Sequence, residues 1–329
     1  MPRFVLFAVL VVGSLFAGTA CGGASSAHRP HRIGVIPKGT SHAFWRAVER
    51  GVMRADREFD DIEVVWKAPM GEGDTTQQIA LFETFMADGY DGMCLAPLDS
   101  LALVGSVRTA LARKTPVLIF DSPLADDTLP IVSTVATDNH RGGRTAGAEL
   151  ARLLNGEGRV IVLRYMVGSF STHQREQGCL EELARHPGIH VISQDIHAGP
   201  DEASAIVAAE RLLTNLGAGT QGVFCSNEST LSGFLTVLQR DPRGFAGKIR
   251  VVGFDASSRI TKALESGLLD ATVVQDPVRM GYLAITTMRD RLNGKETTAR
   301  IETGETLVTR DMLNDPAVRA LLDPLDSGS

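Results

Sequence analysis

The sequence predicts an α/β protein of two doubly wound lobes, each built on a parallel sheet. From residue 32 onward, short apolar runs alternate with longer amphipathic segments. Continuous apolar runs are typical of strands that helices cover on both faces, as in a parallel sheet. The alternation pauses near 132–139 and starts again at residue 159, and two such sets imply two lobes. The length of 329 residues suits two domains of ordinary size.

The first set begins with "RIGVIP" and contains four uninterrupted apolar runs, which we expect to be strands at 32–37, 62–68, 92–97 and 116–121. The amphipathic segments between them predict helices at 43–59, 74–88 and 101–114.

The second set repeats the pattern with five apolar runs, which predict strands at 159–166, 190–196, 222–227, 250–257 and 271–276. The helices expected around them are 141–155, 172–186, 201–216, 229–239 and 258–267. One more amphipathic helix is expected at 278–293, before a polar end of unassigned conformation.

The N-terminus has the composition of an export signal. Arg3 precedes an apolar run at 4–18, which is short for a membrane-spanning helix, and small residues follow it. Cys21 directly after "GTA" resembles the bacterial lipoprotein signal, so we expect 1–21 to be a signal peptide and Cys21 the lipidated residue. An ordinary secretory signal with an incidental cysteine is the alternative. Residues 22–31 then form a flexible tether.

The remaining cysteines lie in apolar strands or a helix, so we expect small buried hydrophobes and at most one disulfide among Cys94, Cys179 and Cys225. The formal charge is −6 and no basic cluster stands out, which argues against nucleic-acid binding.

Sequence motifs of common enzymes are absent. The chain has no G-x-S-x-G, GxxxxGK[ST] or HExxH, and "HRGGRTAG" (140–147) lacks the G-x-G-x-x-G spacing. The glycines of "GEG" at 71–73 are interpreted as marking a turn. Asp121 and Asp255 could form an acid/base pair, but without a catalytic motif they fit better as hydrogen-bond acceptors. We therefore expect no cofactor and no metal.

Polar side chains follow nearly every predicted strand. Ligands of open parallel sheets bind beyond the carboxyl ends of the strands. Amides, carboxylates and a guanidinium beside aromatic rings suit a neutral, hydroxyl-rich ligand. The main strand-end candidates are Ser41, His42, Phe44, Trp45, Asp121, Ser122, Asn139, Ser169, Ser171, Arg175, Asn227, Glu228, Asp255 and Gln275.

Several of these candidates have a plain structural alternative. Phe44 shares a helical stripe with Val48 and Val52, so core and ligand roles are equally supported, whereas Trp45 is offset from that stripe and favours a cleft. Arg175 could be a surface charge. Asn227 could cap the helix that follows it, which is compatible with ligand contact.

The chain from about 32 to 305 resembles the periplasmic ribose/galactose-type sugar-binding proteins, relatives of LacI-type repressor cores. The resemblance rests on motifs in a fixed order: "HAFWRAVERGV", "LAPLDS" (95–100), "PVLIFDS" (116–122), "VATDNHRGGRTAG" (135–147), "REQG" (175–178), "VFCSNE" (223–228), "VVGFDAS" (251–257) and "ATVVQDP" (271–277). An export signal where a repressor would carry a DNA-binding motif favours a receptor.

The resemblance implies the type I periplasmic binding protein fold, with lobes 32–137 plus 276–303 and 138–275 plus 304–329, joined by a three-strand hinge. Ligand binding would close these lobes. It also implies aromatic walls and sugar-binding polar groups at Phe44, Trp45, Asp121, Asn139, Arg175, Asn227, Phe254, Asp255 and Gln275, with Phe254 stacking from the second lobe. His42, Ala96 and Ser122 depart from the ribose-type pattern, so His42 and Lys38 are candidates for altered specificity.

The function implied is that of a lipid-anchored, monomeric receptor, at the periplasmic side or the cell surface, that delivers a sugar-like molecule to the permease of an ABC importer and performs no chemistry. Its association with the membrane would be through the lipid alone. A receptor for a sensor kinase or chemotaxis system is one alternative, and a hydrolase or isomerase on the same scaffold is another. We also expect Asp255→Ala to abolish binding while hardly changing the melting temperature of the unliganded protein.

Overall fold

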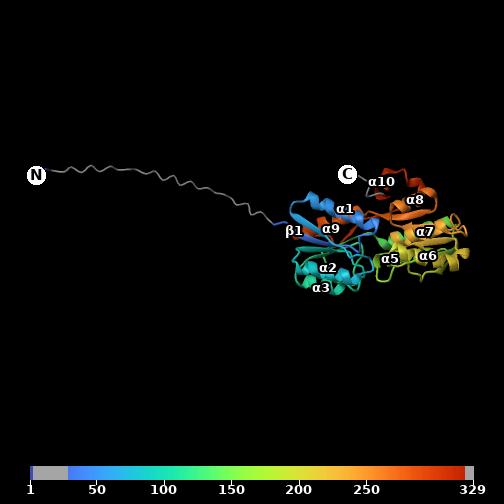
Figure 1. Cartoon of the computed structure of the whole chain (residues 1–329), viewed down its shortest axis with the longest axis horizontal. Coiled ribbons are helices and arrows are strands. Elements are labelled where there is room, and N and C mark those ends of the chain that lie inside the picture. Colours follow the sequence, from blue (N-terminus) through green and yellow to red (C-terminus); the bar gives the residue numbers. More distant parts are fainter. Residues whose placement is uncertain (3–28, 323–329) are drawn as a thin grey trace.

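The computed structural model describes residues 1–2 and 29–322, so the predicted lipidation at Cys21 lies outside the described residues. Within them, the chain forms two lobes that lie side by side, as Figure 1 shows. None of the helices in residues 29–322 is long and apolar enough to cross a bilayer.

The first lobe is built on a six-stranded sheet. Its strands are β1 (His31–Ile36), β2 (Ile62–Trp66), β3 (Gly92–Leu95), β4 (Val117–Phe120), β5 (Thr134–Ala136) and β11 (Arg300–Glu302). Their order is β11-β5-β4-β3-β1-β2, and every pairing is parallel. One face is covered by α1 (Ala43–Glu58) and α9 (Pro277–Leu292), the other by α2 (Thr75–Ala87) and α3 (Val104–Ala112), and each face has its own apolar core (Figure 1).

The second lobe repeats this plan with strands β6 (Glu157–Leu163), β7 (Gly188–Ser193), β8 (Gly222–Cys225), β9 (Arg250–Phe254), β10 (Ala271–Gln275) and β12 (Glu305–Thr309). Their order is β12-β10-β9-β8-β6-β7. One face packs against α4 (Asn139–Leu153) and α5 (Phe170–Leu183). The other packs against α6 (Glu202–Leu216), α7 (Glu228–Arg240), α8 (Ser258–Ser266) and α10 (Pro316–Leu322).

The predicted fold class is confirmed, with one difference at the edge of the second sheet. There β12 pairs with β10 in the antiparallel direction. The carboxyl ends of the parallel strands in both sheets face the space between the lobes. A strand that enters the second sheet from that space, directly after β11, must therefore run against its neighbours. The segments β5, β11, β12 and α10 were not anticipated; β5 and β11 have three residues each, which is too short to show periodicity.

The chain passes between the lobes three times, at 136–139, 275–277 and 302–305. Within the second lobe, glycines allow α4 and α5 to pack very closely. A Cβ on Gly143 would lie 2.0 Å from the Arg175 carbonyl oxygen, and one on Gly178 would lie 2.1 Å from that of His140. The glycines of "HRGGRTAG" therefore serve helix packing, which brings Arg175 to the edge of the sheet.

The three described cysteines, Cys94, Cys179 and Cys225, are buried and free. This confirms their expected role as small core residues.

Candidate functional site

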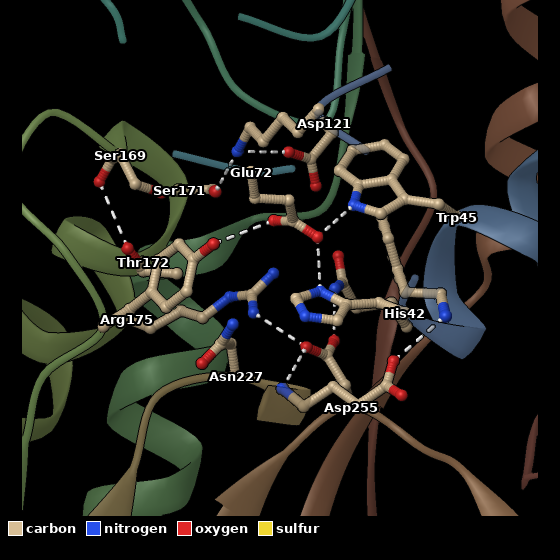
Figure 2. A pocket seen from close by; sticks show the side chains of 15 residues that line it. His42, Trp45, Glu72, Asp121, Ser169, Ser171, Thr172, Arg175, Asn227 and Asp255 are labelled. Carbon is tan, nitrogen blue, oxygen red and sulfur yellow. Dashed lines mark hydrogen bonds and ion pairs between the residues drawn. The ribbon is translucent and has the colours of Figure 1, made fainter. Parts of the chain in front are cut away.

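A small cavity, of about 30 Å³, lies between the lobes, at the carboxyl ends of the strands. Figure 2 shows the side chains that line it, which come from both lobes. The lining residues are Lys38, His42, Phe44, Trp45, Glu72, Asp121, Tyr165, Ser169, Ser171, Thr172, Arg175, Asn227, Glu228, Asp255 and Gln275. Nine of the eleven ligand-binding residues predicted from the sequence are in this set, and Asn139 and Phe254 are not.

Two aspartates at strand ends have an unusual backbone. Asp121 directly follows β4 with φ of 61°, and Asp255 directly follows β9 with φ of 75°. Residues other than glycine adopt this left-handed region infrequently, although aspartate tolerates it better than most. Such strain concentrates at functional sites, where the surroundings hold it in place. Here both carboxylates line the cavity.

Arg175 occupies the second-lobe side of the cavity and is 2% exposed. Its Nε donates to Asn139 Oδ1 at 2.8 Å, and its Nη1 donates to the Ser226 carbonyl at 3.1 Å and to Asp255 Oδ2 at 3.3 Å. The guanidinium carbon lies 3.9 Å from the centre of the Phe254 ring. Arg175 is thus a buried, oriented group, and the surface alternative for it is wrong.

Asn139 and Phe254, both predicted to contact ligand, are not among the residues that line this cavity. Phe254 is fully buried in the core beneath the guanidinium, and Asn139 holds Nε of the same group. Both residues contact the Arg175 guanidinium and help to orient it. A strand-end position alone does not reveal this, because the contacts with Arg175 join segments that are far apart in the sequence.

Asp255 is held by two further donors. Gln275 Nε2 donates to Oδ1 at 2.6 Å, and the backbone N–H of Glu228 donates to Oδ2 at 3.1 Å. Asn227 caps α7 as anticipated, its Oδ1 accepting from the N–H of Thr230 at 3.2 Å, and it also lines the cavity.

On the first-lobe side, Lys38 is 3% exposed and pairs with Asp121 at 2.8 Å. Lys38 Nζ also donates to Ser171 Oγ of the second lobe at 3.2 Å. The N–H of Ser171 in turn donates to Ser122 Oγ at 3.1 Å. The serine that departs from the ribose-type pattern therefore forms a contact between the lobes.

Glu72 was missed by the sequence analysis, which treated residues 71–73 as a turn. The residue is 6% exposed, and its carboxylate contacts three side chains. Oε1 accepts from Trp45 Nε1 at 2.9 Å and pairs with His42 Nδ1, while Oε2 accepts from the Tyr165 hydroxyl of the second lobe at 2.9 Å. A single acid in a glycine-flanked loop has no periodicity or motif that would have revealed it.

The His42–Glu72 pair changes the protonation of both groups. Burial by itself lowers the pKa of His42, but the nearby Glu72 carboxylate outweighs this and, with Glu228 and Asp255, raises that pKa to about 9. Burial also tends to raise the pKa of Glu72, but His42, Lys38 and the Tyr165 hydroxyl lower it below its usual range. At neutral pH the pair is an imidazolium and a carboxylate.

The N-terminus of α1 is capped from the other lobe. His42 stands at the N-cap position but makes no side-chain cap. Instead, the N–H groups of Ala43 and Phe44 donate to the two carboxylate oxygens of Glu228, at 3.0 and 3.1 Å. Free N–H groups and the helix dipole favour a negative charge at this position. Glu228 therefore joins the lobes in this closed arrangement.

Phe44 and Trp45 have both of the roles considered for them. Their rings meet edge to face, with centroids 4.8 Å apart at 85°, and both residues belong to the core packed beneath α1. Both also line the cavity. Core packing fixes the aromatic surface that faces the cleft.

The charges that line the cavity nearly balance. The cations Lys38, His42 and Arg175 face the carboxylates of Glu72, Asp121, Glu228 and Asp255. Each cation is paired with one of these carboxylates. Burial raises the pKa of Glu228. A polar ligand without net charge would leave this balance intact.

The model of the periplasmic binding protein domain family matches residues 33–296. The chain is 27% identical to a D-ribose/D-allose-binding protein of Pseudomonas aeruginosa, over 93% of this chain and 97% of that protein. A solved periplasmic component of a sugar transport system from Hahella chejuensis is 33% identical, with a TM-score of 0.80, over 84% of this chain and 99% of that one. A solute-binding protein from Agrobacterium vitis, solved with α-D-tagatopyranose, is 28% identical, with a TM-score of 0.82, over 89% of this chain and 99% of that one.

Proposed function

Because this chain belongs to the periplasmic binding protein domain family, we propose that it is an extracytoplasmic receptor that binds a neutral sugar or sugar-like polyhydroxy molecule and delivers it to an ABC importer. The observation that carries the proposal is the cavity between the lobes. It combines an aromatic pair with oriented amide, carboxylate and guanidinium groups. Hydroxyl groups both donate and accept, so a polyol can match such a mixed lining.

The balance of charge supports a neutral ligand. An anionic ligand would add an uncompensated charge to a buried site, which is strongly unfavourable. The sugars bound by the similar proteins, D-ribose, D-allose and α-D-tagatopyranose, are neutral.

We assign direct ligand contact to the nine predicted residues that line the cavity: Lys38, His42, Phe44, Trp45, Asp121, Arg175, Asn227, Asp255 and Gln275. Asn139 and Phe254 support Arg175 from behind. The three chain crossings serve as the hinge, and the lobe boundaries are those expected from the sequence. The protein acts as a monomer anchored by a lipid on Cys21, and it catalyses no reaction on its ligand.

A thermal-shift screen of the purified mature protein against pentoses, hexoses, polyols and nucleosides tests the proposal. A ligand that binds the folded state raises the melting temperature by mass action. We expect at least one neutral polyol to do so, and Asp121→Ala to remove the shift. A response confined to charged compounds, or turnover of a bound sugar, would contradict the proposal.

A further inference from the structure

Glu72 is almost fully buried in this arrangement, because its carboxylate is enclosed by its partners. It lies in the loop between β2 and α2, and its oxygens accept from His42 and Trp45 of its own lobe and from Tyr165 of the other. Burial and the adjacent carboxylate keep the pKa of Tyr165 well above its usual value, so the phenol stays a donor. Every contact of Glu72 therefore fixes the orientation of a side chain that lines the cavity.

His42 is left with one unused polar atom. Its Nδ1 pairs with Glu72, whereas its Nε2 is buried and has no hydrogen-bond partner in the described part of the chain. Figure 2 shows the His42 ring among the lining side chains, between Glu72 and Asp255. A buried N–H without a partner costs about 1–3 kcal/mol, so a ligand atom that accepts this proton would gain from doing so.

The protonation of His42 decides what Nε2 offers to a ligand. With the Nδ1 proton directed at Glu72, the imidazolium presents an N–H at Nε2, and the neutral imidazole presents a lone pair there. One proton therefore converts the same atom from donor to acceptor.

We propose that Glu72 is a specificity-determining, positioning residue of the cleft: it holds His42 as a donor whose Nε2–H is presented to an oxygen of the bound ligand. This inference rests on the proposed function, because the acceptor is an oxygen of a polyhydroxy ligand. It implies that a ligand carrying an ammonium group at that point would be excluded.

Other charged groups act on His42 as well. Glu228 and Asp255 of the second lobe favour its protonated form, in the same direction as Glu72. The cations Lys38 and Arg175 also line the cavity and oppose it. Glu72 is the carboxylate that contacts the ring directly, so its removal should have the largest effect.

The first test needs no ligand. The ring signals of His42, identified by their loss in His42→Asn, are followed by NMR through a pH titration of the wild-type protein and of Glu72→Gln. We expect a midpoint near 9 in the wild type and a clearly lower midpoint in Glu72→Gln, where the carboxylate that contacts the ring is absent. An unchanged midpoint would overturn the proposal.

The second test measures the dissociation constant from pH 5.5 to pH 10, using D-ribose, D-allose and D-tagatose as probes, followed by the best polyol of the screen. We expect wild-type affinity to be level up to about pH 8 and to weaken through pH 9. Glu72→Gln should bind about tenfold to a hundredfold more weakly at pH 7.5 and recover at pH 5.5. His42→Asn, an amide donor that does not titrate, should give a level profile.

A Glu72→Gln profile that matches the wild type at every pH would refute the role in ligand binding, since a merely structural Glu72 would not shift the midpoint. If none of the polyols binds, the proposed function fails, whereas the NMR titration still decides whether Glu72 controls His42. The two failures are therefore distinguishable.

Discussion

Replacing Asp255 by alanine removes a carboxylate that Arg175, Gln275 and the N–H of Glu228 share, and we expect the unliganded protein to lose stability. Arg175 and Asp255 are 3% and 7% exposed in their side chains, so the guanidinium would keep a buried charge without its partner. Breaking a buried pair in this way costs about 3–5 kcal/mol. This reverses the expectation drawn from the sequence, in which the melting temperature of the unliganded protein hardly changes.

The assay is thermal and denaturant unfolding of the ligand-free proteins. A loss of this size lowers the melting temperature of a chain this long by on the order of 10 °C. Asp255→Asn is the matched control, because asparagine tolerates the left-handed backbone and keeps one acceptor oxygen, so its loss should be smaller. The double variant Arg175→Met/Asp255→Ala should recover part of the stability, since the unpaired charge is then absent.

The three partners of Asp255 all lie in the second lobe or at its hinge edge, so opening of the lobes would not by itself separate them. A melting temperature for Asp255→Ala within about 1 °C of the wild type would refute the reasoning. It would mean that Arg175 reaches water in the free protein.

Three further outcomes are expected. Glu228→Ala removes both interlobe hydrogen bonds to α1, so affinity for the best polyol should fall by about 5-fold to 30-fold. Small-angle scattering should also show a larger radius of gyration. An unchanged radius and affinity would contradict this role of Glu228. His42 has a folded-state pKa raised from 6.5 to about 9, so its stabilising effect is complete below pH 6.5 and lost as the pH rises through 9. The free energy of unfolding should therefore fall by roughly 3 kcal/mol between pH 6.5 and 10, and Glu72→Gln should lack this fall. Burial raises the pKa of the thiols of the described cysteines, Cys94, Cys179 and Cys225. A thiol reagent should therefore modify them in denaturant and not in the folded protein. Rapid modification of the native protein would exclude their buried arrangement.

Much of the fold was predictable because its signals are local. Continuous apolar runs identified the long strands, and amphipathic segments identified the helices between them. Strand-end polarity identified most of the cavity lining, since the carboxyl ends of parallel strands meet at one edge. Asn227 belongs to this group, because capping depends on the residue and its position before a helix.

The remaining site residues depend on contacts between distant segments. Glu72 lies in a loop whose residue types indicate a turn, and its partners include Tyr165, 93 positions away in the sequence. Glu228 caps α1 across 185 positions, and Phe254 lies behind Arg175 because α4 and α5 pack closely. Periodicity and spacing contain no information on such pairings.

The sequence by itself therefore determined the two-lobed α/β fold, the aromatic pair and the inventory of polar groups at the strand ends, because each depends on neighbours within a few residues. The tertiary structure decided which of those groups face the cavity, which support others from behind, and which carboxylate sets the protonation of His42. Hydrogen bonds and charge pairing act over a few ångströms in space whatever the separation along the chain, and only the folded chain brings those atoms within that distance.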